Sequence, residues 1–130
     1  MARQMDVLVF VGRSLIAVLF LSGAAQKAVD PGPAMALLTG LGLPAILVWP
    51  ALVFNGLAGL AVLVGWAVRP VAAALAVYCA VTSVFHLIPS DPWQMSIFVK
   101  NWAIAGGCLV LAAHGPGRYV LGKADSGAQV

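Results

Sequence analysis

The chain has 130 residues, of which 62% are hydrophobic and only 8% are charged, and its net charge is +3. This composition, with a mean hydropathy of +1.02, leaves too little polar surface for a water-soluble globule, and the scattered Lys and Arg residues exclude nucleic acid as a partner. We therefore expect one integral membrane domain over residues 1–130, with the lipid bilayer as its main partner.

Four hydrophobic segments follow one another along the chain, and each is long enough for a membrane span of about 20 residues. We place the spans at about residues 7–25, 43–68, 70–88 and 95–113. The segment between the first two begins with Pro31 and ends at Gly42, as suits a short helix lying in the membrane interface. The prediction is an all-α fold: a four-transmembrane-helix bundle with a short interfacial helix between spans 1 and 2, and a flexible tail at residues 119–130.

The distribution of charges predicts the orientation of the bundle. An even number of spans places both chain ends on the same side of the membrane. That side carries the larger share of basic residues, which are Arg3, Arg69, Arg118 and Lys123. The opposite loops carry Lys27 together with two acidic residues, Asp30 and Asp91. Because basic loops stay in the cytoplasm, we expect the N- and C-termini to be cytoplasmic.

Two basic residues belong to the first span or its end. Arg13 lies about six residues, or roughly 9 Å, inside the cytoplasmic end of the span. Its side chain either snorkels to the phosphate headgroups or is a cation that faces the bundle. Lys27 follows 14 residues later, which returns it to within about 40° of the same helix face. Ala17 and Ala24 share that face, so we expect it to turn into the bundle, although Lys27 could equally be an interfacial anchor.

A group of polar side chains is predicted in the outer third and toward the middle of the bundle. Its members are Lys27, Asn55, His86, Lys100 and Asn101. Lys100 is followed by Ala103 and Gly107 on its own face, so we expect it on the close-packing side of the fourth span. In one interpretation these groups bond to each other and to the nearby aspartates, and fasten the helix ends. In the other they form a pocket for an anionic headgroup or the carbonyls of a quinone, with His86 able to carry a proton.

The remaining chemistry-bearing residues indicate neither a metal nor a haem site. His86 and His114 lie at opposite ends of their spans, about a bilayer apart, so they do not share a haem. Cys79 and Cys108 fall inside spans without a metal-binding spacing, and we interpret them as packing residues. No nucleophile, base and orienting group occur together, so we assign no catalytic residue.

Several short motifs occur in a fixed order along most of the chain. They are Gly12-Arg13 and FLSGAAQK (20–27) in the first span, Asn55-Gly56 and residues 65–69 in the second, Lys100 with Gly106-Gly107 in the fourth, and GPGRYVLG (115–122) near the end. With these motifs the chain resembles the DoxX family of small four-span membrane proteins. The resemblance implies a four-helix bundle in a bacterial-type plasma (inner) membrane. The chain departs from the family pattern at Asn55, where many relatives have Glu, and at Gly122, where the ending often has Asp.

The resemblance also implies an association with redox chemistry. Some relatives resemble the membrane subunit of thiosulfate:quinone oxidoreductase, and others are linked to thiol and oxidative stress. The first hypothesis is therefore a membrane subunit that binds a quinone or lipid, with quinone as its candidate cofactor, and works with a separate, peripheral oxidoreductase subunit. The second is a non-catalytic assembly or scaffold protein that packs against a partner or forms a homo-oligomer. The third is permeation of a small anion through an oligomer.

Overall fold

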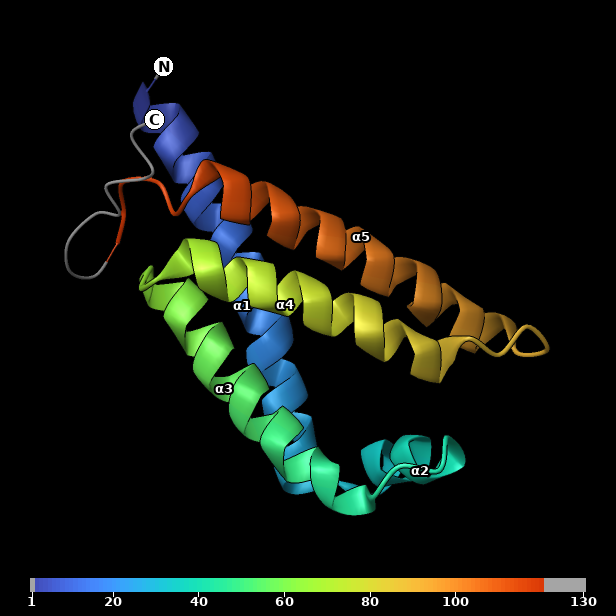
Figure 1. Cartoon of the computed structure of the whole chain (residues 1–130). Coiled ribbons are helices and arrows are strands. Elements are labelled where there is room, and N and C mark those ends of the chain that lie inside the picture. Colours follow the sequence, from blue (N-terminus) through green and yellow to red (C-terminus); the bar gives the residue numbers. More distant parts are fainter. Residues whose placement is uncertain (1, 121–130) are drawn as a thin grey trace.

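The computed structural model describes residues 2–120, and within them the secondary structure is helical (Figure 1). Its elements are α1 (Ala2–Val29), α2 (Gly32–Gly40), the 3-10 turn η1 (Ala45–Leu47), α3 (Val48–Val64), α4 (Val68–Thr82), the 3-10 turn η2 (Ser83–His86) and α5 (Pro92–His114). Within this range, four helical segments are long and apolar enough to cross a membrane: Arg3–Val29, Ala45–Val64, Val68–His86 and Pro92–His114. The predicted all-α membrane bundle, with a short helix between the first two spans, is confirmed.

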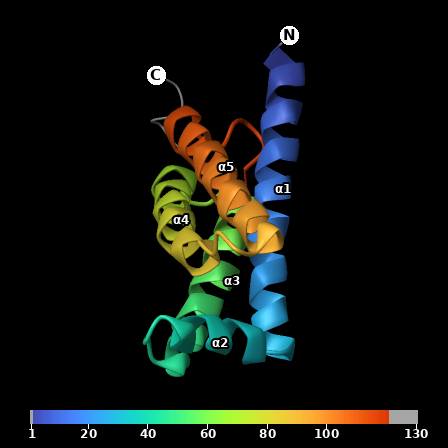
Figure 2. The same ribbon diagram turned by 90° about the vertical axis from the view of Figure 1, so that its right-hand side faces the viewer.

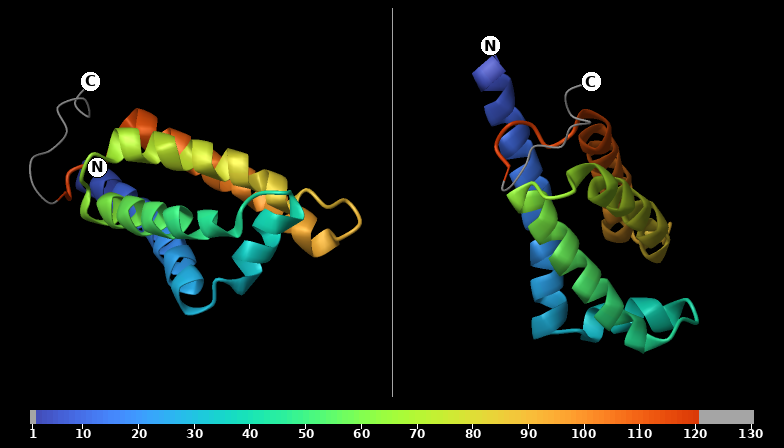
Figure 3. Two further views of the ribbon diagram at one scale, coloured as in Figure 1. Left: turned by 60° about the horizontal axis from the view of Figure 1, so that its bottom comes forward. Right: turned by 60° about the vertical axis from the view of Figure 1, so that its left-hand side comes forward.

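The helices pack as two pairs, α1 with α3 and α4 with α5, and the contact between the pairs is much smaller. Figures 1 and 2 show the pairs meeting near the N-terminal half of α1 and diverging toward the other end, where α2 lies near the ends of α1 and α3. Figure 3 shows from two further sides that α2 lies between the end of α1 and the start of α3. We name the first end the arginine end, because Arg13 and Arg69 bond there, and the second the α2 end.

Small residues allow the helices of each pair to approach closely. A Cβ added at Gly59 of α3 would lie 3.0 Å from the Leu21 side chain of α1. The fully buried positions between the helices are small or medium apolar residues: Ala17, Val62, Val68, Ala72, Leu75 and Cys108. Cys79 and Cys108 belong to this apolar core, and both are free thiols.

The ends of the helices follow from local chemistry. Gly65, with φ of 86°, ends α3 in the left-handed region, where a residue without a side chain is favoured. A Cβ there would also lie 2.7 Å from the side chain of Val120. At the other end of the molecule, α5 begins with Pro92 at its first position, and the Asp91 carboxylate accepts from the backbone N–H groups of Trp93 and Gln94, at 3.0 and 3.4 Å.

The span boundaries differ from the predicted ones in instructive places. α1 continues to Val29 beyond the expected end at residue 25, because no breaker precedes Pro31. α3 is shorter than residues 43–68, because η1 takes up its start and Gly65 ends it. The flexible tail was expected from residue 119, yet Tyr119 and Val120 pack against the bundle. The rest of that tail, with Gly122 and Lys123, lies outside the described residues.

Candidate functional site

Arg13 is buried at the arginine end of the bundle, where it bonds several parts of the chain. Its side chain is 2% exposed. One terminal nitrogen donates to the Pro116 carbonyl at 2.6 Å, and the other donates to the carbonyls of Tyr119 and Leu63, at 2.6 and 3.2 Å. The guanidinium carbon also lies 5.3 Å from the centroid of the Phe10 ring. Arg13 therefore faces the bundle and ties α1 to α3 and to residues 116–119, and the snorkelling interpretation is wrong for this side chain.

Arg69 connects the two helices of the other pair, α4 and α5, as Arg13 connects α1 and α3. Its terminal nitrogens donate to the carbonyls at the end of α5, those of Ala112, Ala113 and His114, at 3.3, 2.6 and 3.2 Å. The last carbonyls of a helix lack partners within the helix and carry partial negative charge, so a cation is favoured there. The start of α4 is thereby fastened to the end of α5, and the polar chemistry at this end is structural.

The α2 end holds a different polar group, centred on one amide oxygen. Asn55 on α3 is 2% exposed, and its Oδ1 accepts from Lys27 Nζ on α1 at 3.1 Å. The hydroxyl of Tyr78 on α4 donates to the same oxygen at 3.2 Å. Lys27 Nζ also lies 3.5 Å from the Gly23 carbonyl. Within residues 2–120 no carboxylate pairs with Lys27, so its positive charge is balanced only by dipoles.

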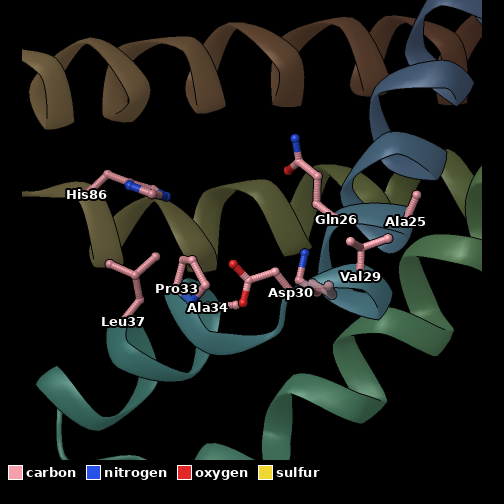
Figure 4. Close-up of a pocket in the computed structure, with 9 residues that line it drawn as sticks. Ala25, Gln26, Val29, Asp30, Pro33, Ala34, Leu37 and His86 are labelled. Carbon is pink, nitrogen blue, oxygen red and sulfur yellow. The ribbon is translucent and has the colours of Figure 1, made fainter.

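Two cavities adjoin this group, with volumes of about 670 and 320 Å³. Both are lined by Lys27, Ala34, Leu37 and His86, and we name them together the α2 cleft. Figure 4 shows the larger cavity, which lies between α1, α2 and η2. The smaller one reaches Tyr78 and has apolar walls formed by Leu38, Leu43, Leu47, Val48, Ala51 and Phe85. The cleft thus combines a cation, a hydroxyl and an imidazole with a predominantly apolar wall, the usual make-up of a small-molecule site.

His86 stands on the side of the cleft opposite α1. Its Nδ1 lies 2.7 Å from Oε1 of Gln94, which belongs to the first turn of α5. In Figure 4 the imidazole extends from η2, which follows α4, over Leu37 of α2. Asp30 also lines the larger cavity, but its Oδ1 accepts from the Gly32 backbone N–H at 3.2 Å and supports the start of α2. The aspartates therefore shape the helix starts here, and neither fastens the lysines as the structural interpretation expected.

The structure corrects the prediction for the fourth span. Lys100 is exposed, as are Ala103 and Gly107 on its face, whereas the packed side of α5 carries Ala105 and Cys108. Lys100 and the half-buried Asn101 line neither part of the α2 cleft. The reason is the divergence of the helix pairs. A Cβ at Gly107 would lie 3.8 Å from Ile16 of α1, whereas nearer the α2 end Ala103 and Lys100 on the same face of α5 are exposed.

Two of the candidate residues, Lys27 and His86, therefore line one cleft. The buried Asn55 bonds Lys27 without lining either cavity, and Arg13 belongs to the opposite end. Sequence reasoning missed Tyr78 and Gln94. A tyrosine hydroxyl inside an apolar span normally needs a partner, which is a signal that pointed to Tyr78. Gln94 carried no comparable signal, because its role depends on a turn that brings α5 back beside His86.

Comparison with known proteins agrees with this architecture. The DoxX family model matches residues 8–87, which include Lys27, Asn55 and His86. The chain is also similar to "Inner membrane protein YqjF" of Escherichia coli (strain K12), with 29% identity over 124 residues that cover 95% of each chain. No solved structure matches the chain. Together with the four apolar helices, these findings support a multi-pass inner membrane protein, and the chain belongs to the DoxX family.

Proposed function

We propose that this protein is a membrane subunit that binds a quinone-class lipid in the α2 cleft and serves a separate oxidoreductase. The observation that carries the proposal is the Lys27 ammonium, held by Asn55 Oδ1 at 3.1 Å, on the wall of a largely apolar cleft. An uncompensated cation inside a membrane bundle is costly, and such residues commonly serve a ligand or a transport path.

The groups in the cleft suit the oxygens and the ring of a quinone. An ammonium has three N–H donors, and the contacts to Asn55 and Gly23 leave one of them for a ligand oxygen. The Tyr78 hydroxyl donates to Asn55 and so offers the ligand only acceptor lone pairs, which suit the hydroxyl of a reduced quinone. The apolar walls of the smaller cavity offer contact area to a ring or to the first part of a hydrophobic tail.

The oxidoreductase itself is expected to be a different chain. Reduction of a quinone to a quinol takes two electrons and two protons. The polar side chains of the cleft, Lys27, Tyr78 and His86, can supply hydrogen bonds or protons but not electrons, so in this proposal the electrons come from a peripheral partner. We further propose that the arginine end is cytoplasmic, because Arg3, Arg69 and Arg118 are on that side. The α2 cleft then opens toward the opposite side of the inner membrane, where the partner would dock.

A second candidate function, an assembly or scaffold protein, is favoured by one observation. The exposed face of α5 carries a lysine among small residues: Lys100, Ala103, Gly106 and Gly107. Small residues permit close helix packing, and a cation in lipid gains from a partner with an acceptor. A scaffold predicts that Lys100→Met changes the oligomer size without affecting quinone binding. Anion permeation remains a third hypothesis, although the bonds of Arg13 remove that residue from a pore wall.

The proposed quinone site can be tested with two lysine variants. Lys27→Met removes the cation from the cleft, and Lys100→Met is its matched control because it removes an exposed cation outside the cleft. Each protein is purified in mild detergent, its organic extract is analysed by mass spectrometry, and its affinity for decylubiquinone is measured by titration. A hydrogen bond from a charged donor contributes about 1.5–3 kcal/mol, so Lys27→Met should weaken binding about 10- to 100-fold.

The proposal predicts near-stoichiometric quinone in the wild type and in Lys100→Met, and its loss from Lys27→Met. Bulk phospholipid alone in all three extracts, with no measurable decylubiquinone affinity, would contradict it. Equal quinone content in wild type and Lys27→Met would also do so, because the site would then lie elsewhere.

A further inference from the structure

The contact between His86 and Gln94 determines which ring nitrogen of His86 carries a hydrogen, on the wall of the cleft opposite α1. His86 Nδ1 and Gln94 Oε1 are 2.7 Å apart, and both side chains are half-buried. The backbone of Gln94 is fixed in the first turn of α5, because its N–H donates to the Asp91 carboxylate. In this orientation the Gln94 amide turns its oxygen to His86, and because an amide oxygen only accepts, Nδ1 of His86 carries the hydrogen.

The second ring nitrogen of His86, Nε2, is then a hydrogen-bond acceptor. In a neutral imidazole with a hydrogen on Nδ1, Nε2 bears a lone pair and accepts hydrogen bonds. No residue within 2–120 bonds Nε2, and His86 lines both parts of the α2 cleft. The imidazole reaches into the larger cavity, above Leu37 (Figure 4). One wall of the cleft therefore presents a donor, Lys27, and the opposite wall presents an acceptor.

We propose that Gln94 is a positioning residue: by accepting a hydrogen bond from Nδ1 of His86, it leaves Nε2 as a hydrogen-bond acceptor on the wall of the cleft. This acceptor makes the cleft bind a reduced quinol more tightly than the oxidised quinone. The preference rests on the proposed function, because it concerns the ligand of the same site. A quinol oxygen can accept from Lys27 while a quinol hydroxyl donates to Nε2. An oxidised quinone has only carbonyls, so it leaves Nε2 without a partner, and an unmet buried acceptor weakens binding.

The roles of the two ring nitrogens can be read without any ligand. The chain contains two histidines, so the protein with ¹⁵N-labelled imidazoles in lipid nanodiscs gives two sets of signals, and His114→Asn leaves those of His86. The ¹⁵N shifts of a neutral imidazole distinguish its two tautomers, and a series of spectra at rising pH identifies the neutral form. We expect hydrogen on Nδ1 of His86 in the wild type and in Gln94→Glu, which keeps an acceptor oxygen. In Gln94→Met, which has none, we expect the other tautomer or a mixture.

The preference for quinol is measured with decylubiquinol, kept reduced under argon, and with decylubiquinone. One additional hydrogen bond of about 0.5–1.5 kcal/mol corresponds to a preference of about 2- to 10-fold for the quinol. The wild type and Gln94→Glu should have this preference, and Gln94→Met should bind both forms equally. Ser96→Ala, at an exposed position of α5 outside the cleft, is the control and should behave as the wild type.

The two experiments separate this inference from the function on which it rests. A hydrogen on Nε2 of wild-type His86, or the same tautomer in Gln94→Met as in the wild type, would overturn the role of Gln94 even if quinones bind. Equal affinity of the wild type for both forms would overturn the preference. If neither decylubiquinol nor decylubiquinone binds, both the proposed quinone site and the quinol preference are wrong. The tautomer of His86 still tests, without any ligand, whether Gln94 positions the imidazole.

Discussion

At the arginine end, Arg13 and Arg69 each donate to three backbone carbonyls, and these bonds join all four long helices and residues 116–119. At the α2 end, Lys27 and Tyr78 share one amide oxygen, and two cavities lie beside them. Both ends place cations inside a membrane bundle, but the arginines donate to backbone carbonyls that connect separate helices, whereas Lys27 lies on the wall of two cavities. The comparison supports our proposal that the arginine end holds the fold together and that the α2 end binds a ligand.

Removing Arg13 should have the largest effect on stability. Arg13→Met leaves the carbonyls of Pro116, Tyr119 and Leu63 without their donor, and it frees residues 116–119 from α1. Because intramembrane hydrogen bonds contribute about 0.6–2 kcal/mol each, we expect unfolding to become easier by about 2–4 kcal/mol, measured by denaturant titration in detergent. Arg13→Lys should restore only part of this, since an ammonium lacks the planar fork of donors. Wild-type stability of Arg13→Met would show that the two ends do not differ as described.

Gly65→Ala should have the next largest effect, again at the arginine end. Alanine is strained at φ of 86°, and its Cβ would approach Val120 to 2.7 Å. We expect a loss of about 1–3 kcal/mol in the free energy of unfolding. Gly12→Ala is the matched control, because a Cβ there has no atom within 4 Å and should leave the melting temperature almost unchanged. Equal effects of the two substitutions would mean that residues near Val120 do not pack on the bundle.

The smallest effect is expected at the α2 end, for Tyr78→Phe. The change removes a hydroxyl that donates to Asn55 at 3.2 Å and preserves the ring, which packs 5.3 Å from the Phe54 ring. Because the hydroxyl oxygen could accept a hydrogen bond from a reduced ligand, we expect decylubiquinol affinity to fall about 2- to 5-fold, with a stability change below about 1 kcal/mol. If Tyr78→Phe lost much stability but kept its ligand affinity, Tyr78 would instead hold the helices together, as the arginines do at the other end.

The fold was predictable from the sequence because it depends on features that act along the chain. Uncharged stretches long enough to span the bilayer, with Pro31, Gly42 and Pro44 between the first two, determine the number of spans and the short helix. Lys27 and His86 were also expected toward the outer end, with Asn55 nearer the middle, since depth follows from residue position along a span.

Which way a side chain points could not be predicted equally well. In a membrane helix the lipid-facing and packed sides are both apolar, so the pattern of residues does not distinguish them. Lys100 was therefore assigned to the packed side, although it is exposed where α5 diverges from α1. The GPGRY motif carried no physical explanation in the sequence, and only the fold reveals that Arg13 bonds the carbonyls of Pro116 and Tyr119.

The central claim, that the ligand site is at the α2 end and the structural fastening is at the arginine end, is tested most directly by ligand-induced thermal stabilisation. Wild type, Gly65→Ala and Lys27→Met are melted with and without decylubiquinol at about 100 times the wild-type Kd, where binding contributes about 2.7 kcal/mol. We predict that Gly65→Ala melts earlier than the wild type but gains as much from the ligand, and that Lys27→Met melts near the wild type but gains little. Full stabilisation of Lys27→Met, or its loss in Gly65→Ala, would contradict the account.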